Sequence, residues 1–360
     1  MQELERLIKS WDGLAVLTKF DKPTGTWIFI CIHDDTLGMS TGGTRIVTYP
    51  NPADGLRDAM RLSEGMTHKW AAVDMGFGGA KAVLAMPHPL TGEERRGLLE
   101  RYAGMINLLG GKFLTGEDMG ITPEDMDYLA RHTDHMHGYD VNGNKVDPSP
   151  YTARGVLTAM KTALEHKFGD ASLRGRRVVV QGAGNVGGHL IRMLDEEGAE
   201  ILIDDVDEGH ASELARLHGA EWINGGDPYS TACDIFAPCA VGATLNQRTI
   251  PRLECQIVAG AANNQLEVRD DVERLRERGI LYAPDYIVNA GGAISFAHLG
   301  QGIWKQNELF DRVDSIGTTL AEILREADEQ DESTLAAADR RVQRNLERAR
   351  GGQRPTPSSR

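Results

Sequence analysis

The stretch RVVVQGAGNVGGHLIRMLDEEGAEILIDD, residues 177–205, constrains the fold of this chain more than any other part of the sequence. A β-branched run leads into Gly182, Gly184 and Gly187, which open an amphipathic helical pattern. A second β-rich run follows and ends at Asp205, 23 residues after Gly182. A strand, a glycine turn, a helix and a second parallel strand form the dinucleotide-binding unit of doubly wound α/β sheets.

The residues of this unit have distinct expected roles. The first glycine makes the turn, the second lets the backbone approach a pyrophosphate, and the third allows close packing of helix on strand. Asn185 and Val186 lie at the predicted helix N-terminus, which favours an anion. The carboxylate of Asp205 is expected to accept hydrogen bonds from ribose hydroxyls and to repel a 2′-phosphate, so NAD is the predicted cofactor. The alternative is a glycine turn that merely connects two elements, and the presence of the whole unit argues against it.

The rest of the chain indicates two domains of α/β class. A length of 360 residues exceeds one ordinary core, and residues 141–152, rich in Asn, Gly, Asp and Pro, predict a linker. Before the linker, the patterns predict strands at 14–20, 26–33, 44–49 and 81–86, and helices at 53–69, at 92–109 and after Thr122. After it they predict parallel strands at 177–181, 200–205, 234–239, 256–262 and 280–290 with helices between, and a helical segment at 311–349.

Composition excludes several classes of function. A net charge of −14 argues against nucleic acid as a main partner, and no apolar run approaches the roughly 18 residues of a membrane span. The four cysteines are scattered, which predicts a reduced, cytoplasmic protein. The three histidines of HTDHMH (132–137) have metal-like spacing, but we expect a surface segment there and no metal site.

Lys81 stands between glycines and an apolar run in MGFGGAKAVL, residues 75–84. A phosphate-binding loop is excluded, because GxxxxGK[ST] needs a glycine before the lysine and a hydroxyl after it, and Ala80 and Ala82 occupy those places. Two interpretations stay open. One is a catalytic lysine whose pKa is lowered by burial and by a neighbouring cation, for which Lys69 is the candidate. The other is an exposed loop lysine.

Many ordered motifs between residues 30 and 296 make the sequence similar to one enzyme family. The chain resembles the leucine/phenylalanine/valine dehydrogenase branch of the amino-acid dehydrogenase superfamily. The motifs are GGTR (42–45), RLSEGMTHK (61–69), GGAKAVL (78–84), TGEDMGITPEDM (115–126), DPSPYTARGV (147–156), APCAVGATLN (237–246), AGAANNQL (259–266) and APDYIVNAGG (283–292).

The resemblance implies a domain plan. Residues 1–146 are expected to form an α/β domain for substrate binding and oligomerisation, and residues 147–310 a Rossmann-type NAD-binding domain, with the active site in the cleft between them. The helical segment 311–349 follows, and whether it returns to the first domain stays open. Residues 350–360 are expected to be disordered. The resemblance also implies a homo-oligomer of undetermined size, with the N-terminal strands as a possible contact.

Roles follow position by position from the resemblance. Lys69 is expected to hold the substrate α-carboxylate, Lys81 to activate water, and Asp118 to move protons at the amino group. The remaining positions match residues that line the substrate or the cofactor: Gly42, Gly43 and Asn264 for the substrate, and Thr152, Ala240 and again Asn264 for NAD. The implied reaction is reversible oxidative deamination of an L-amino acid to a 2-oxo acid and ammonia.

The substrate side chain is expected to meet Thr41, Gly116, Ala293 and Phe296. Glutamate-specific relatives have a lysine at the position of Thr41, so glutamate is disfavoured. Three of the four residues are small, as in phenylalanine enzymes, whereas Phe296 is large. One methylene gives only about 1–3 kcal/mol of discrimination, so residue size does not rank the substrates. We favour branched-chain substrates, with phenylalanine or another aromatic amino acid as the alternative. A non-catalytic NAD-binding protein is the alternative from another class.

Overall fold

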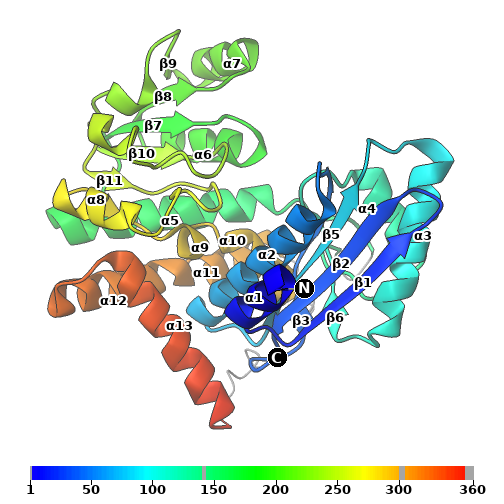
Figure 1. Ribbon diagram of the computed structural model, residues 1–360. Helices are drawn as coiled ribbons and strands as arrows, with labels where there is room; N and C mark the ends of the chain where they lie inside the picture. Colours follow the sequence, from blue (N-terminus) through cyan, green and yellow to red (C-terminus); the bar gives the residue numbers. More distant parts are fainter. Residues whose placement is uncertain (1, 140–142, 300–304, 353–360) are drawn as a thin grey trace. The chain divides into compact units, whose positions relative to one another are not determined.

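The computed structural model describes residues 2–139, 143–299 and 305–352. The chain divides into two compact units, one formed by residues 1–145 together with 342–360 and the other by residues 146–341. Each unit contains one six-stranded sheet in its described residues (Figure 1). The predicted disordered tail lies outside the described residues from residue 353 onward.

The sheet of the first unit has the order β1-β2-β5-β3-β6, and β4 also pairs with β5. β1 and β2 form an antiparallel hairpin, β2 runs antiparallel to β5, and β3 and β4 run parallel to β5. The strands are β1 (Ala15–Asp21), β2 (Thr26–Asp34), β3 (Ser40–Thr41), β4 (Thr44–Thr48), β5 (Gly78–Met86) and β6 (Phe113–Leu114). The helices are α1 (Gln2–Trp11), α2 (Pro52–Ala72), α3 (Gly92–Leu108), α4 (Pro123–Ala130) and the end of α13 (Thr334–Arg350).

Both faces of β5 are covered, so every residue of this strand is buried. Its even-numbered residues, such as Ala82 and Leu84, pack in the core that contains residues of α3 and α4. The odd-numbered Val83 and Ala85 pack with residues of α2 (Figure 1). Because side chains alternate along a strand, Lys81 belongs to the face that α2 covers.

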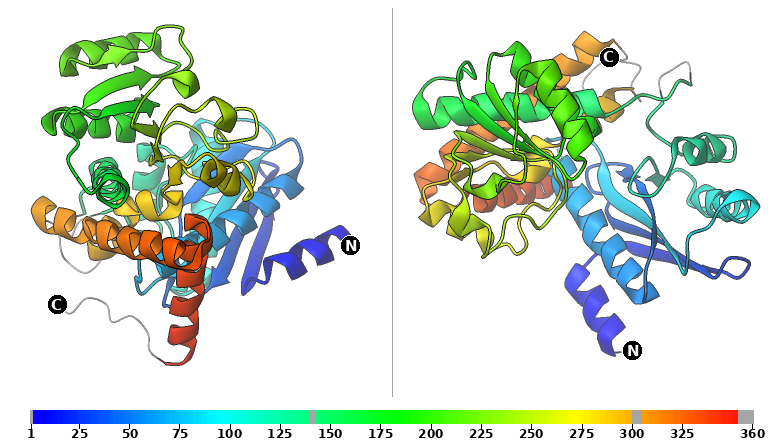
Figure 2. Two further views of the ribbon diagram at one scale, coloured as in Figure 1. Left: turned by 90° about the vertical axis from the view of Figure 1, so that its left-hand side faces the viewer. Right: turned by 90° about the horizontal axis from the view of Figure 1, so that it is seen from above.

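The sheet of the second unit is entirely parallel and has the order β12-β11-β10-β7-β8-β9. The strands are β7 (Arg177–Gln181), β8 (Glu200–Asp204), β9 (Glu221–Trp222), β10 (Ile235–Pro238), β11 (Ile257–Val258) and β12 (Leu281–Tyr282). The helices are α5 (Ser149–Phe168), α6 (Asn185–Glu196), α7 (Glu208–His218), α8 (Asp271–Glu277), α9 (Asp285–Val288), α10 (Gly291–Leu299), α11 (Gln306–Val313), α12 (Ser315–Gln330) and the start of α13. α5 runs beside α6 (Figure 2).

The predicted α/β class is confirmed, with some differences in the elements. Residues 149–152 of the expected linker form the first turn of α5. The strand expected at 280–290 ends at Tyr282, because a turn at Pro284 starts helix α9. The single helical segment expected at 311–349 is split into three helices by breaks at Asp314 and at residues 331–333. Three short strands, β3, β6 and β9, were not predicted, since two residues carry no alternation pattern.

The end of α13 is bonded to the end of α2 and to the loop between α2 and β5. Asn345 donates from Nδ2 to the carbonyl oxygen of Ala71 at 2.8 Å, and Arg348 pairs with Asp74 at 2.5 Å. Residues 342–352 therefore belong to the first unit, while residues 306–341 belong to the second.

Candidate active site

Lys81 is the fourth residue of β5 and is 5% exposed. The interpretation of an exposed loop lysine is therefore wrong. The strand begins at Gly78, three residues earlier than the sequence pattern predicts, because the glycines Gly78 and Gly79 pair with β2 and β3 in the ladder. A charged group in such a place needs a partner of opposite charge.

That partner is Asp118. Lys81 Nζ lies 3.1 Å from Asp118 Oδ1. Asp118 lies in the segment between β6 and α4. This segment runs along the edge of β4 and is hydrogen-bonded to it. The backbone N–H groups of Thr44 and Ile46 donate to the carbonyl oxygens of Gly116 and Met119, both at 2.9 Å. The two predicted catalytic residues are therefore brought together within the first unit by β4 and β5.

Two glycines permit this close packing. A Cβ on Gly42 would lie 1.7 Å from the carbonyl oxygen of Ala80, and a Cβ on Gly43 would lie 2.6 Å from that of Glu117 and 2.9 Å from the Cβ of Asp118. Real Cβ atoms do not approach so closely, so any larger residue would push the β3–β4 segment away from Lys81 and Asp118. The expected contact of both glycines with a substrate carboxylate stays a prediction.

The electrostatics of the pair favour an ionised aspartate and a lysine that gives up its proton easily. Burial lowers the pKa of Lys81 below its usual 10.5 and the charge of Arg45 adds to this, while Asp118 acts in the opposite direction. Burial raises the pKa of Asp118, but the charges of Lys81 and Arg45 outweigh this effect and the net shift is downward.

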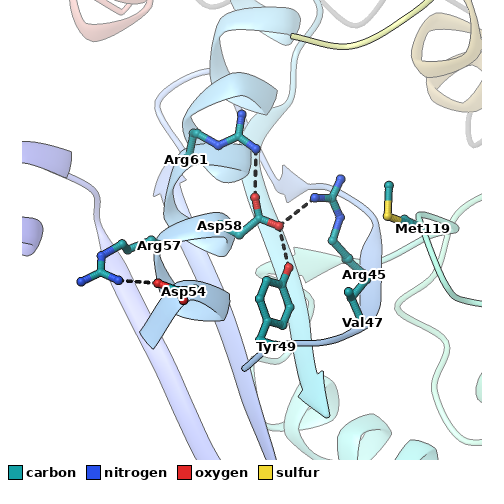
Figure 3. A pocket seen from close by; sticks show the side chains of 8 residues that line it. All are labelled: Arg45, Val47, Tyr49, Asp54, Arg57, Asp58, Arg61 and Met119. Carbon is teal, nitrogen blue, oxygen red and sulfur yellow. Dashed lines mark hydrogen bonds and ion pairs between the residues drawn. The ribbon is translucent and has the colours of Figure 1, made fainter. Parts of the chain in front are cut away.

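Arg45 is a functional candidate that the sequence reasoning missed. Its Nε donates to Asp118 Oδ2 at 2.9 Å, and its guanidinium also donates to Asp58 Oδ2 at 2.7 Å. Asp58, on α2, accepts further bonds from the hydroxyl of Tyr49 at 2.7 Å and from Arg61 at 2.9 Å. Figure 3 shows these three donors converging on Asp58 beside an open pocket of about 430 Å³. The signal that could have revealed Arg45 is the alternation of side chains along β4. Arg45 and Val47 lie on the face that α2 covers, whereas Ile46 lies in the opposite core.

Lys69 lies half-buried in the last turn of α2. This part of the helix is pressed directly onto β5, because a Cβ on Gly79 would lie 2.1 Å from Thr67 Oγ1 and 2.2 Å from the Thr67 backbone nitrogen. Lys69 lies two residues after Thr67 on the helix, and Lys81 lies two residues after Gly79 on the strand. The predicted role of Lys69 at the substrate carboxylate stays a prediction.

The space beside Gly116 is already occupied. A Cβ on Gly116 would lie 2.2 Å from Cε1 of His137, so the imidazole fills the volume that a larger residue at position 116 would need. The backbone N–H of His137 donates to the carbonyl oxygen of Thr115 at 2.8 Å, and this strand-like pairing holds His137 beside Gly116. Burial and the charge of Lys81 lower the pKa of His137 to about 4, so the ring is neutral. Sequence reasoning placed residues 132–137 on the surface, whereas His137 is half-buried.

Thr41, the other predicted side-chain contact of the first unit, is 3% exposed. Its hydroxyl is buried and has no hydrogen-bond partner among the described residues. A buried hydroxyl without a partner costs free energy. A ligand atom that bonds to it would remove that cost.

In the second unit, the glycine loop between β7 and α6 has the predicted form. Gly182 has a φ of +100°, and a Cβ on Gly187 would lie 2.0 Å from the carbonyl oxygen of Gly182. A Cβ on Gly184 would meet nothing within 4 Å, so the loop is open on that side. Gly184 is the N-cap of α6 and supplies no side-chain cap, which leaves the N–H groups at Asn185 and Val186 for an anion. The loop therefore fits a dinucleotide pyrophosphate.

Asp205 directly follows β8 and is tied to this loop. Its Oδ2 accepts from the backbone N–H of Ala183 at 2.6 Å, and its Oδ1 accepts from that of Asp207 at 2.8 Å. Each carboxylate oxygen has a second lone pair, so the group can still accept from a ribose hydroxyl. Ala240 lies exposed at the end of β10 against the turn, since a Cβ on Gly182 would be 2.6 Å from its backbone nitrogen.

The other predicted residues of the second unit lie on α5, on α10 and in the loop after β11. A Cβ on Gly292 would lie 2.8 Å from Thr152 Oγ1, which brings the starts of α5 and α10 together. Ala293 and Phe296 are half-buried and one turn apart, whereas the other residues of α10 are buried. Asn264 is exposed with a φ of +52°, and its carbonyl oxygen accepts from the backbone N–H of Ala243 at 2.7 Å.

Two family models match the chain. Residues 21–135 match the dimerisation domain of Glu/Leu/Phe/Val dehydrogenase, and residues 145–207 and 203–351 match glutamate/leucine/phenylalanine/valine dehydrogenase.

The similar proteins include a leucine dehydrogenase of Geobacillus stearothermophilus, which is 37% identical over 98% of this chain and 96% of the relative. A phenylalanine dehydrogenase of Lysinibacillus sphaericus is 39% identical over 91% of this chain and 87% of the relative. The crystal structure of L-tryptophan dehydrogenase from Nostoc punctiforme superposes with a TM-score of 0.83 at 37% identity, covering 96% of this chain and 99% of that chain.

Within the described residues, no helix has the length and apolar character needed to cross a membrane. Both family models describe amino-acid dehydrogenases, and together they match nearly the whole chain. The three similar proteins are also amino-acid dehydrogenases, and each of them matches nearly the whole chain. The chain therefore belongs to the Glu/Leu/Phe/Val dehydrogenase family and is an amino-acid dehydrogenase that uses a nicotinamide cofactor.

Proposed function

We propose that the protein catalyses the reversible NAD-dependent oxidative deamination of an apolar L-amino acid, with a branched-chain, leucine-type substrate preferred. The observation that carries the proposal is the buried ion pair of Lys81 and Asp118, 3.1 Å apart. A lysine of lowered pKa beside an ionised carboxylate can move protons to and from water and an amine.

In this proposal Lys69 binds the α-carboxylate of the amino acid, and its ammonium supplies the opposite charge. Asp118 takes a proton from the substrate's ammonium group, and a bound nicotinamide ring would accept the hydride of Cα, so that the substrate becomes an iminium ion. Lys81 Nζ takes a proton from water, and the hydroxide adds to the iminium carbon. Asp118 returns its proton to the nitrogen and then accepts the proton of the new hydroxyl group, the carbon–nitrogen bond breaks, and ammonia and the 2-oxo acid leave.

NAD is the proposed cofactor because of Asp205. The carboxylate is fixed by two backbone N–H groups, at Ala183 and Asp207, so it cannot turn away easily from the ribose position. A fixed negative charge there favours a 2′-hydroxyl, which donates a hydrogen bond, over a 2′-phosphate, which is repelled. Gly182, Gly184 and Gly187 with the start of α6 are assigned to the pyrophosphate.

The leucine-type preference is supported by His137. The small residue Gly116 would widen the space for a substrate side chain, but the imidazole of His137 fills that volume. A space reduced in this way suits a branched aliphatic group better than an aromatic ring. The Geobacillus relative, 37% identical over 98% of the chain, is a leucine dehydrogenase.

An aromatic amino acid is the second candidate, and Thr41 favours it. The buried hydroxyl of Thr41 has no hydrogen-bond partner among the described residues. The indole N–H of tryptophan is a donor that this oxygen can accept. The Nostoc structure with a TM-score of 0.83 is a tryptophan dehydrogenase.

We also propose that the protein forms a homo-oligomer in the cytoplasm. β1 has one partner strand among the described residues and so leaves a strand edge open. Phe20 on β1 and Trp27 on β2 pack ring on ring, 5.1 Å apart, and both are exposed. The first family model is named for dimerisation and begins at residue 21, so it covers Trp27 and strand β2 but not Phe20. Sedimentation velocity of the purified protein tests this assignment.

One assay tests the proposed function. The purified protein is mixed with NAD and, in turn, leucine, isoleucine, valine, phenylalanine, tryptophan or glutamate, and formation of the reduced cofactor is followed by absorbance. We expect the highest kcat/KM with leucine and other branched-chain substrates and no turnover of glutamate. The highest value with tryptophan would support the second candidate. No turnover of any amino acid, with NAD or NADP, would refute the proposal.

A further inference from the structure

We propose that Arg45 is a positioning residue for the reaction, held in place by Asp58, and that it sets both the orientation of Asp118 and the pH range in which Lys81 and Asp118 work. This inference rests on the proposed function, because it assigns Arg45 a part in the same proton transfers.

The carboxylate of Asp118 is shared between two cations. Oδ1 faces Lys81 Nζ at 3.1 Å, whereas Oδ2 accepts from Arg45 Nε at 2.9 Å. A guanidinium N–H has a fixed direction in its plane, whereas a lysine ammonium rotates, so this contact defines the position of Oδ2. Arg45 therefore holds one oxygen, and the other stays directed at Lys81 and at the amine that is to receive a proton.

Arg45 is itself immobilised, both through the neighbouring backbone and through its side chain. The residues before and after it, Thr44 and Ile46, donate their backbone N–H groups to the segment that carries Asp118. Its guanidinium donates to Asp58 Oδ2, and Asp58 is held in turn by Tyr49 and Arg61 (Figure 3). Arg45 and Asp58 are only 17% and 15% exposed, so solvent weakens these contacts little.

The charged groups around Arg45 alternate in sign. Lys81, Asp118, Arg45, Asp58 and Arg61 form a row of alternating charges, linked by contacts of 3.1, 2.9, 2.7 and 2.9 Å. The positive charge of Arg45 favours the ionised form of Asp118 and disfavours the ammonium form of Lys81. The negative charge of Asp58 acts on Lys81 in the opposite direction. Removal of Arg45 and removal of Asp58 should therefore shift the working pH range with opposite signs.

The test is the pH dependence of kcat in the oxidative direction for the wild type, Arg45→Gln, Arg45→Lys and Asp58→Asn. The parameter is kcat, because the free substrate's own amino group titrates and would enter kcat/KM. In Arg45→Gln the acid-side limb should move up by about one pH unit or more, and kcat should fall more than KM rises. Arg45→Lys should show a smaller shift because the charge remains. Asp58→Asn should move the limb to lower pH.

Arg101→Gln is the matched control. Arg101 also pairs with an aspartate of the first unit, Asp21, through Nε and a second nitrogen, and it does not contact Asp118. Its removal should lower the melting temperature and leave the pH profile of kcat unchanged. Circular dichroism shows which variants fold, and if Arg45→Gln does not, Arg45→Lys and Asp58→Asn carry the test.

The outcomes separate the two proposals. Opposite shifts in Arg45→Gln and Asp58→Asn, with an unshifted Arg101→Gln, would establish the role of Arg45. An Arg45→Gln protein with the wild-type pH profile, or shifts of the same sign in Arg45→Gln and Asp58→Asn, would overturn the role of Arg45. Turnover of an amino acid by the wild type would still support the proposed function. A wild type that turns over no amino acid would instead refute the proposed function.

Discussion

Lys81 Nζ lies 3.1 Å from Asp118 Oδ1, and both groups belong to one unit of the chain. The lysine comes from the middle of a fully buried strand, and the aspartate from a segment bonded along the edge of a neighbouring strand. Two rigid backbone elements therefore fix the distance between the two groups to which the proposal assigns the proton transfers. The second unit supplies the glycine loop and Asp205, the groups assigned to the cofactor.

The pH dependence of the reaction should follow Lys81. In the proposed mechanism the neutral form of Lys81 takes the proton from water, so kcat for oxidative deamination should rise with pH as the ammonium form disappears. Since burial and Arg45 lower the pKa of Lys81, the half-maximal point should lie below the usual lysine value of 10.5. A pH series of kcat at saturating substrate and cofactor measures it. A half-maximal point at or above 10.5 would contradict the electrostatic description of the site.

His137 should limit the size of the substrate side chain. His137→Ala removes the imidazole that lies where a Cβ of Gly116 would be, and it leaves an opening beside the site. The ratio of kcat/KM for phenylalanine to that for leucine should therefore rise about tenfold. His135→Ala, two residues earlier, is the control and should leave the ratio unchanged. An unchanged ratio in a folded His137→Ala protein would remove His137 from the specificity assignment.

Asp205 should control the choice of cofactor. Asp205→Ser keeps a hydrogen-bonding group near Ala183 and Asp207 but removes the negative charge. The ratio of kcat/KM with NADP to that with NAD should rise at least about tenfold, which corresponds to about 1.4 kcal/mol. Asp207→Asn serves as the control, because asparagine also caps helices and Asp207 caps α7. If the serine variant discriminates against NADP as strongly as the wild type does, Asp205 has another role.

The part of the fold that depends on local pattern could be predicted from the sequence. The unit at 177–205 was identified because three glycines, a helix and two strands follow each other in one continuous segment. The start of α4 after Thr122, which caps this helix, was likewise predicted from residues next to the helix start. Such features need no knowledge of distant contacts.

Features that depend on contacts between distant segments were missed. Lys81 could not be identified as buried, because its burial requires α2 on the strand face that it shares with Val83. Arg45 is 73 residues from Asp118 and 13 from Asp58, and these groups meet only because β4 bonds to residues 116–119 and α2 packs on the sheet. His137 was placed on the surface, because its segment is polar and its contact with Gly116 arises from a single strand-like pairing at Thr115.

The most direct test of the account is the turnover of Lys81→Ala. The account assigns the activation of water to this amine, so kcat with the best amino acid should fall by about 10²- to 10⁴-fold while circular dichroism shows a folded protein. Added ethylamine should restore part of the activity in this variant and not in the wild type. A folded Lys81→Ala protein with kcat close to that of the wild type would contradict the central claim.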